Sequence, residues 1–503
     1  MRITNNMMLN NTSKNINGNK LNVNALNLQM TSQKKIQRPS EDPVIAIRAL
    51  RLRSTLSQIN QCYERNIPDA ETWMEVSETA LKNMNKILTD VRTQCVNGTN
   101  SYLTAEDRNT ILSSLSALQK QLYSEGNADN GGRTVFTGYK TNSPLTFMEA
   151  EADTSYEISQ NFTYEDIEEH EYLSGSVDVP NTLDEVLETD NICKIDKTSC
   201  DRIRLAYDSI EEIEGISYTY GDPTTTVEPA VTIYEDEDAW SAACVDGIKT
   251  VGENEMIFIK SSGDLVLGTA ISNELKSNKA SIDIEYQKTG FDEGELRPEY
   301  YYNCVDVTDK VNPIEYTRYD ENGKKVYEDI NFTVALNQNL KVNMEANEIF
   351  DMSIYQDVVE MTDAVQAAID AHDKVDKLTE MRDQAQYVDY QEQIQEWLDA
   401  AQKEADYADQ NLTNLYGAAV GKFDAYMEEL NIAYTELGSR GEQLAMTESR
   451  VSNQQLTVEE LKSTNEDKEL SDIIIDYTAA YNAYQAALLA AGKMEEQTLL
   501  NYI

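Results

Sequence analysis

The chain has 503 residues, of which 40% are hydrophobic and 26% charged, and its formal net charge is -47. This length is too great for one ordinary core, so we expect two or three domains. Such an acidic chain repels the phosphates of nucleic acids and anionic membranes, because binding to either depends on Lys and Arg. The composition therefore argues against a nucleic acid partner.

The negative charge is unevenly distributed along the chain. Residues 1–150 hold 17 Lys and Arg against 13 Asp and Glu, residues 151–350 hold 15 against 45, and residues 351–503 hold 10 against 31. The middle of the chain is thus the most acidic part, and the N-terminal part is slightly basic. We expect the acidic middle to face solvent, where its charge favours solubility.

No stretch of the sequence approaches the ~20 apolar residues that are needed to span a bilayer. The N-terminus runs into Asn-rich sequence without an apolar core, which argues against a cleavable signal peptide. The six Cys show no paired spacing, so free thiols are the expected state. We therefore expect no membrane insertion, and either a cytoplasmic location or export that reads an uncleaved N-terminus.

The first forty residues are predicted to form a helix only in contact with a partner. Asn is a poor helix former and supplies ten of the first thirty residues. Leu21, Ala25 and Leu28 nevertheless keep a spacing of four and three. This arm is expected to become helical once a partner covers it.

A long helix is predicted after Pro43, with Ser40 as its N-cap and Asn97-Gly98 at its end. Its apolar positions recur every three or four residues along the whole stretch. They include Ile45, Leu52, Ile59, Trp73 and Met84. A second helix is predicted to open with a capping box at Thr104 and Asp107.

The sequence changes character at about residue 140. Helical periodicity disappears, and short alternating runs at 256–260 and 265–268 predict strands. A hairpin is predicted over 315–329, around the turn at 320–323. A β-rich domain is therefore inserted between two helical regions.

Helical periodicity returns near residue 351. A capping box is predicted at Ser353–Gln356, and later apolar positions fall at the spacing of a coiled coil. These positions include Phe423, Leu430 and Leu437, followed in the last helix by Ile473, Tyr477, Tyr484, Ala487 and Met494. The simplest way to bury the two helical regions is against each other.

The predicted fold class is α+β and multidomain: a long antiparallel α-helical coiled-coil bundle formed by the N- and C-terminal regions, with an inserted β-rich central domain. The expected domains are, in order, an N-terminal assembly arm (1–40), an N-terminal helical rod (41–140), the acidic β-rich insert (141–350), a C-terminal helical rod (351–460) and a C-terminal assembly helix (461–503).

Candidate chemical sites are weak. His170 and Glu171 begin a string like HExxH, but position 174 is Ser, so a zinc site fails and a solvated acidic loop is expected. The acidic runs at 165–171 and 235–238 favour solvated charge over a divalent cation site. His372 is a lone, packed or rim histidine. We expect no catalytic residue, no metal, no cofactor and no enzymatic activity.

Several motifs together resemble the flagellin superfamily. They are the start Met1–Thr4, the segment Arg38–Pro43 with Ala46, the segment Asn130–Gly138, and the stretches Tyr484–Leu488 and Leu499–Ile503. Within the superfamily the chain is most similar to the family of hook-associated proteins at the hook–filament junction. The resemblance covers roughly 1–147 and 350–503.

This resemblance implies a structural adaptor of the bacterial flagellum that is exported by the flagellar type III route. It implies four partners: a ring of further copies, the first hook-associated protein, flagellin, and an export chaperone on the C-terminal helix. The expected assembly interface comprises Leu21, Ala25, Leu28, Ile473, Tyr477, Tyr484, Ala487 and Met494. The rod core comprises Ile45, Leu52, Ile59, Trp73, Met84, Phe423, Leu430 and Leu437.

Two alternatives remain open. One is a bulk flagellin, which would share the same terminal helices. The other is a glycan-binding adhesin, in which Tyr300, Tyr301 and Tyr302 of the insert would be exposed for stacking. We also hypothesise that both termini are unordered in the monomer and fold together on assembly.

Overall fold

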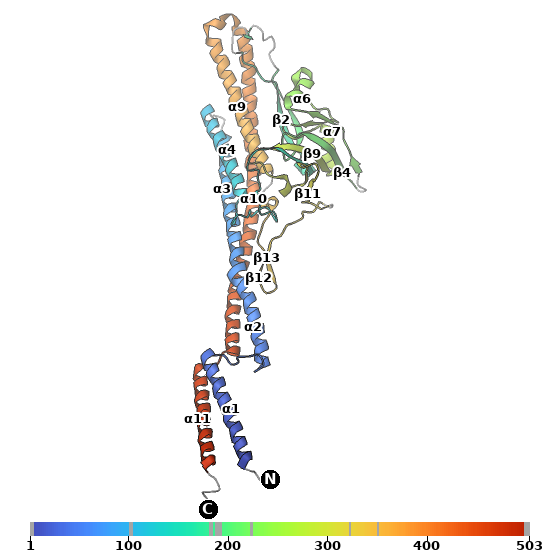
Figure 1. Ribbon diagram of the computed structural model, residues 1–503. Coiled ribbons are helices and arrows are strands. Elements are labelled where there is room, and N and C mark those ends of the chain that lie inside the picture. Colours follow the sequence, from blue (N-terminus) through green and yellow to red (C-terminus); the bar gives the residue numbers. More distant parts are fainter. Residues whose placement is uncertain are drawn as a thin grey trace, which may run out of the picture. The chain divides into compact units, whose positions relative to one another are not determined.

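A computed structural model describes residues 5–99, 104–180, 185–186, 194–221, 225–320, 323–349 and 352–496. The chain divides into two compact units. Unit 1 holds residues 1–71, 332–340 and 441–503, and unit 2 holds 72–331 and 341–440. Long helices near both chain ends and a β-rich middle confirm the predicted fold class (Figure 1).

Helices from both chain ends build unit 1. They are α1 (Asn5–Ser32), α2 (Pro43–Gln61), a π-helical turn η1 (Cys62–Asn66), the start of α3 (Ile67–Gly98), the end of α10 (Gln391–Glu466) and α11 (Leu470–Glu496). The hairpin of β12 (Asn331–Ala335) and β13 (Gln338–Lys341) contributes most of its residues to the same unit. The predicted single helix after Pro43 is therefore interrupted by η1.

The predicted N-cap of α2 is wrong. Asp42, not Ser40, caps the helix: its Oδ1 accepts hydrogen bonds from the backbone N–H of Val44 at 2.9 Å and of Ile45 at 3.2 Å. A carboxylate at this position also suits the positive end of the helix dipole. Pro43, which lacks an N–H, occupies the first helical position as expected.

In unit 1, α2 and the end of α10 run antiparallel. The Asn60 and Gln455 side chains meet at 3.1 Å, and the Asn465 amide donates to the Ile45 carbonyl at 3.1 Å. Higher numbers on one helix thus meet lower numbers on the other. This is the antiparallel arrangement that the fold class predicts.

The helices of unit 2 are also antiparallel. Besides most of α3, they are α4 (Ala105–Gly126), α9 (Ser353–Asp383) and the first part of α10. Arg92 pairs with Asp424 at 2.6 Å, and the Tyr434 hydroxyl donates to Glu78 at 3.1 Å. The α3 and α10 segments therefore run in opposite directions.

Two predicted helix starts had opposite outcomes. The capping box of Thr104 and Asp107 is present at the start of α4, which confirms that prediction. The box predicted at Ser353–Gln356 is wrong, because the N-cap of α9 is Met352 and makes no side-chain hydrogen bond. Gln356 instead donates its side-chain amide to the Leu205 carbonyl of the β-rich region.

The β-rich part of unit 2 contains a six-stranded antiparallel sheet with the order β11-β10-β1-β9-β4-β5. Its strands are β1 (Glu151–Thr163), β4 (Glu212–Tyr220), β5 (Thr225–Val227), β9 (Ser281–Phe291), β10 (Asn303–Asp306) and β11 (Ile314–Tyr316). The predicted hairpin over 315–329 is wrong in extent. β11 pairs with β10, and the hairpin is limited to a short segment around Gly323. There a bridge joins Tyr319 and Lys325, and the Val326 N–H donates to the Arg318 carbonyl at 2.8 Å.

A second sheet has five strands in the order β2-β3-β8-β7-β6, with only β6 and β7 parallel. Its strands are β2 (Glu168–Ser174), β3 (Asp196–Arg204), β6 (Val231–Tyr234), β7 (Met256–Ile259) and β8 (Asp264–Leu267). The strands predicted at 256–260 and 265–268 are thus confirmed. Short helices complete the unit: α6 (Glu237–Ala243), α7 (Thr269–Asn278), α8 (Ala346–Ile349), η2 (Tyr164–Asp166), η3 (Val245–Gly247), η4 (Pro298–Tyr300) and η5 (Ala385–Tyr390).

Candidate assembly surface

The terminal helices α1 and α11 pack side by side in unit 1, with their far ends pointing the same way (Figure 1). On α11 the inward side chains are buried or half-buried and recur every three or four residues. They are Ile473, Tyr477, Ala480, Tyr484, Ala487 and Ala491. Four predicted interface residues, Ile473, Tyr477, Tyr484 and Ala487, therefore lie toward α1. Met494 belongs to α11, but its side chain lies outside the described residues.

The stripe of α1 that packs on α11 is not the predicted one. Its buried or half-buried positions, spaced by four and three, are Thr12, Ile16, Asn19, Val23, Leu26 and Met30. Leu26 is only 8% exposed. Two of the six residues are polar, so a search for apolar spacing missed this stripe. The spacing itself, with polar residues admitted, would have found it.

Leu21, Ala25 and Leu28 lie on the outward side of α1. Leu21 is 70% exposed and Leu28 is 50% exposed. The outward side of α11 is apolar as well: Ile474, Ile475, Tyr481, Leu488 and Leu489 are all exposed. The helix pair therefore covers one stripe on each helix and leaves a second apolar stripe uncovered, which is typical of a surface that binds another protein.

Ion pairs and backbone hydrogen bonds join the segment that connects α1 to α2 with the segment that connects α10 to α11. The Lys35 N–H donates to the Glu466 carbonyl at 2.7 Å, and the Lys468 N–H donates to the Gln33 carbonyl at 3.0 Å. Arg53 binds Glu466 through Nε at 2.8 Å and Nη2 at 2.6 Å. Hydrogen bonds from Arg53 hold the pKa of Glu466 below its usual value. The two connecting segments therefore bind each other directly.

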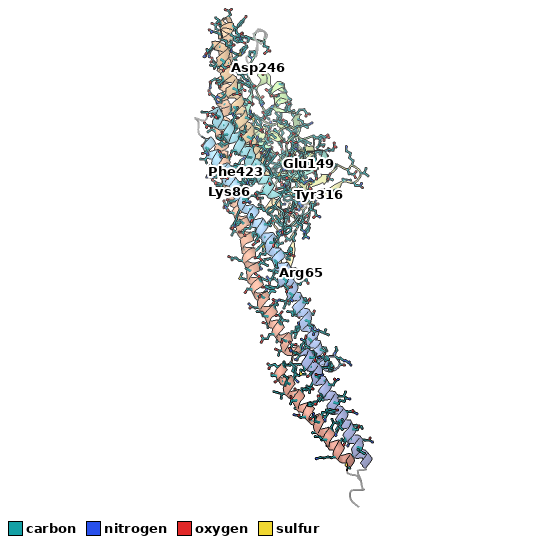
Figure 2. All side chains as sticks on the ribbon, turned by 60° about the vertical axis from the view of Figure 1, so that its left-hand side comes forward. Arg65, Lys86, Glu149, Asp246, Tyr316 and Phe423 are labelled. Atoms are coloured by element: carbon teal, nitrogen blue, oxygen red, sulfur yellow. The ribbon has the colours of Figure 1, made fainter. Side chains whose placement is uncertain are left out.

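The predicted rod-core residues differ in burial. Ile45 and Leu52 are only half-buried in α2, whereas Ile59 is buried. In unit 2, the remaining five are all buried: Trp73, Met84, Phe423, Leu430 and Leu437. Figure 2 labels Phe423, whose exposed fraction is 0%. The helical core is therefore tighter in unit 2 than at the start of α2.

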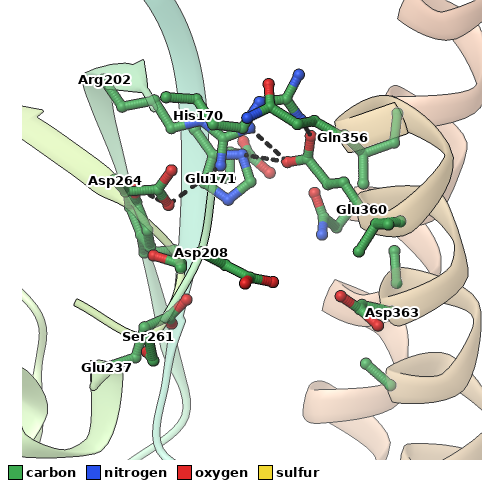
Figure 3. A pocket seen from close by; sticks show the side chains of 18 of the residues that line it. His170, Glu171, Arg202, Asp208, Glu237, Ser261, Asp264, Gln356, Glu360 and Asp363 are labelled. Carbon is green, nitrogen blue, oxygen red and sulfur yellow. Dashed lines mark hydrogen bonds and ion pairs between the residues drawn. The ribbon is translucent and has the colours of Figure 1, made fainter. Parts of the chain in front are cut away.

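A charged network joins β2 and β3 to α9 and α10 within unit 2 (Figure 3). Arg202 binds Glu168 at 2.8 Å, Glu360 at 2.6 Å and Asp264 at 3.3 Å. Arg204 binds Glu360 at 2.8 Å and Asp357 at 2.6 Å. Each of these carboxylates has an Arg partner, so the charges of the network are balanced by side chains of this chain.

The expectation of a solvated acidic loop around His170 is wrong. His170 lies in β2, and its Nδ1 is 3.2 Å from Glu360 Oε1. Burial, followed by the charge of Arg202, lowers the pKa of His170 to about 4. Although burial raises the pKa of Glu168, Arg202 and Arg204 outweigh it and lower that pKa to about 2. Contacts from distant parts of the chain half-bury Glu168 and His170, whereas Glu165, Asp166 and Glu169 stay exposed.

A cavity of about 430 Å³ lies beside this network, between the β-rich region and α9. Asp208 and Asp363 face each other across it in Figure 3. Among the described residues, however, no group of three or more His, Cys, Asp or Glu could hold a metal ion. The described Cys residues are all free.

The adhesin alternative loses its stacking surface. Tyr300 and Tyr301 are only 2% and 4% exposed, and Tyr302 is half-buried. The prediction that these three rings are exposed is therefore wrong.

In the ranges that the structure describes, no helix is both long and apolar enough to cross a membrane.

The N-terminal part of the chain matches known proteins. Residues 3–141 match the bacterial flagellin N-terminal helical region. Flagellar hook-associated protein 3 of Salmonella typhimurium is 28% identical over 142 residues, which are 28% of this chain and 44% of that protein. This part of the chain is therefore similar to the flagellin superfamily.

A second relative, flagellar hook-associated protein 3 of Escherichia coli K12, is 29% identical over 114 residues, or 22% of this chain and 36% of that protein. The chain thus spans less than half the length of the curated relatives it matches. The predicted resemblance to the hook-associated proteins of this superfamily is confirmed.

A crystal structure of FlgL from Xanthomonas campestris is 11% identical and covers 82% of this chain and 99% of that chain, with a TM-score of 0.32. At that TM-score the likeness supports no inference about this chain.

Proposed function

We propose that this chain is a structural component of the bacterial flagellum, and that it acts as an adaptor at the hook–filament junction. The observation that carries the proposal is the uncovered apolar stripe on each terminal helix. Each Å² of exposed apolar surface that another subunit covers stabilises the association by about 25 cal/mol. The similarity of residues 3–141 to the bacterial flagellin N-terminal helical region supports further copies and other flagellar proteins as the partners.

The proposed assembly uses the pair of α1 and α11 as its contact element. Ile473, Tyr477, Tyr484 and Ala487 hold α11 on α1, while Leu21 and Leu28 face outward toward neighbouring subunits. Copies of the chain would form a ring between the first hook-associated protein and flagellin, and the ring would template flagellin assembly. Cations and cofactors have no part in this role.

We further propose export without a cleavable signal peptide to the extracellular flagellum, with a chaperone on the C-terminal helix until export. The helix pair has a property that suits such a route. Its inward stripes contain Asn, Thr and Ala, which bury little apolar area. An isolated pair of this kind is weakly stable, so it can be unfolded for export and can refold at the growing tip.

Limited proteolysis of the monomer tests whether the two termini are folded before assembly. If both ends fold on assembly, cleavage begins before residue 33 and after residue 468, and the products retain unit 2. First cuts within the strands of unit 2 would contradict this part of the proposal.

Deletion of the gene tests the adaptor role. We expect cells that retain hooks, lack filaments and release flagellin into the medium, and electron microscopy of the cell surface measures the first two outcomes. A bulk flagellin, the second candidate, would instead be the filament subunit itself and would be present along the whole filament. Normal filaments on the deletion strain would overturn the adaptor proposal.

A further inference from the structure

The outward side of α2 is a basic and apolar stripe. Opposite the buried Ala46, Leu56 and Ile59, the exposed residues follow a spacing of three and four: Val44, Ile47, Arg51, Ser54 and Gln58. Val44 is 60% exposed and Ile47 is 54% exposed. The helix contains three Arg and no acidic residue. Such a stripe suits an acidic partner with apolar side chains of its own.

The outward side of α10 in the same unit is acidic and apolar. Opposite the buried Leu444 and Val451, the exposed residues again follow a spacing of four and three: Glu442, Met446, Ser449, Asn453, Leu456 and Glu460. Met446 is 68% exposed and Leu456 is 61% exposed. Both stripes therefore mix large exposed apolar side chains with charges, and the charges have opposite signs.

The charges of both stripes are unused within the chain. Arg51, Glu442 and Glu460 form no hydrogen bond or ion pair with any residue in the described ranges. By contrast, Arg53 on the same helix is engaged by Glu466. Arg51 is therefore free to bind another protein, whereas Arg53 is held by Glu466.

The two stripes lie on different helices of one antiparallel pair, and Arg51 and Glu460 lie at the same level. Contacts of Asn60 with Gln455 and of Ile45 with Asn465 set the antiparallel register of α2 and α10. Between these contacts, Arg51 is level with the turn that contains Glu460. Within the described ranges, no hydrogen bond or ion pair joins the two residues in one copy. A neighbour that is displaced sideways, without a shift along the helices, brings them together.

We propose that the outward stripe of α2 in one copy binds the outward stripe of α10 in the next copy, with Arg51 opposite Glu460. This contact is heterologous, since it joins two different surfaces, and its repetition produces a ring or a helical array. The inference rests on the proposed function and adds the surfaces through which copies meet side by side. The occupant is a second copy, because the complementary charge lies on the same unit at the matching level.

A charge exchange tests this contact in cells that lack the native gene. Arg51→Glu and Glu460→Arg each place like charges together, and each is expected to lower the number of filaments per cell about tenfold or more, because like charges in an interface are strongly unfavourable. The double variant restores an opposite pair and is expected to recover to within about threefold of the native count. Lys86→Glu, on an exposed residue of α3 in unit 2 (Figure 2), is the matched control and leaves the count unchanged.

The melting temperature of each purified variant separates loss of contact from loss of folding. A normal filament count for Arg51→Glu would overturn the inference, and so would a double variant that fails to recover while its melting temperature stays native. Either result leaves the adaptor role intact if the deletion strain still lacks filaments. Filaments on the deletion strain would instead remove the proposed function itself.

Discussion

The outward apolar residues of the terminal helices provide the sharpest test of the assembly surface. Leu21 and Leu489 are each 70% exposed. The test replaces both with Gln, which has nearly the helix propensity of Leu and so leaves the helices themselves little changed. The double variant Leu21→Gln/Leu489→Gln should therefore fold normally and assemble poorly.

The size of the effect follows from these exposed fractions. Complete burial of a Leu side chain contributes about 1.5–3 kcal/mol, so burying the remaining seven-tenths contributes roughly 1–2 kcal/mol. Two such residues give roughly 2–4 kcal/mol for each subunit, which weakens association on the order of a hundredfold. The monomer should change by less than about 0.5 kcal/mol, because neither side chain is part of its core.

Two assays measure the two quantities separately. Urea unfolding of the purified monomer gives the free energy of unfolding, and filament counts in the complemented deletion strain report assembly. Val311→Gln is the matched control, since Val311 is 83% exposed but belongs to the β-rich part of unit 2. Native filament counts for the Leu double variant, or equal losses for Val311→Gln, would refute the reasoning.

Three further predictions concern unit 2. Phe423→Ala removes a fully buried ring and should lower the free energy of unfolding by about 3–5 kcal/mol in urea titrations; a loss below about 1 kcal/mol would contradict its place in the core. Gly98→Ala would place a Cβ 2.3 Å from the buried ring of Tyr416 and should cost about 1–3 kcal/mol, whereas Gly18→Ala in α1 meets no atom within 4 Å and should stabilise its helix slightly; equal melting temperatures for the two would show that the ring moves freely. Because burial lowers the pKa of His170 from 6.5 to about 4, the unfolded chain binds a proton more readily, and stability should fall as the pH drops from 6.5 to 4. His170→Gln should reduce that slope in unfolding experiments across this pH range, and an unchanged slope would place the titration elsewhere.

Much of the architecture could be read from local patterns. The spacing of three and four residues in the terminal regions predicted helices, because side chains at that spacing share one face of an α-helix. Thr104 and Asp107 predicted a helix start, because the capping box involves only residues of the same turn. The inward face of α11 was predicted as well, because no charged or amide side chain breaks the spacing of its apolar residues.

Features that depend on distant contacts could not be predicted in this way. The inward stripe of α1 includes Thr12 and Asn19, and only its packing on α11, more than 400 residues away in the chain, distinguishes it from the more apolar stripe of Leu21 and Leu28. The sequence around His170 is acidic and polar, yet Arg202 of β3 and Glu360 of α9 bring His170 and Glu168 into a half-buried ionic network. The Tyr300 and Tyr301 rings are buried for the same reason.

The sequence by itself determined where helices and strands form, because hydrogen bonding and side-chain periodicity within an element involve only neighbouring residues. The tertiary structure alone decided which face of each helix is covered and which remains open. Burial depends on the register between elements that are far apart in the chain, and that register is set by their packing together.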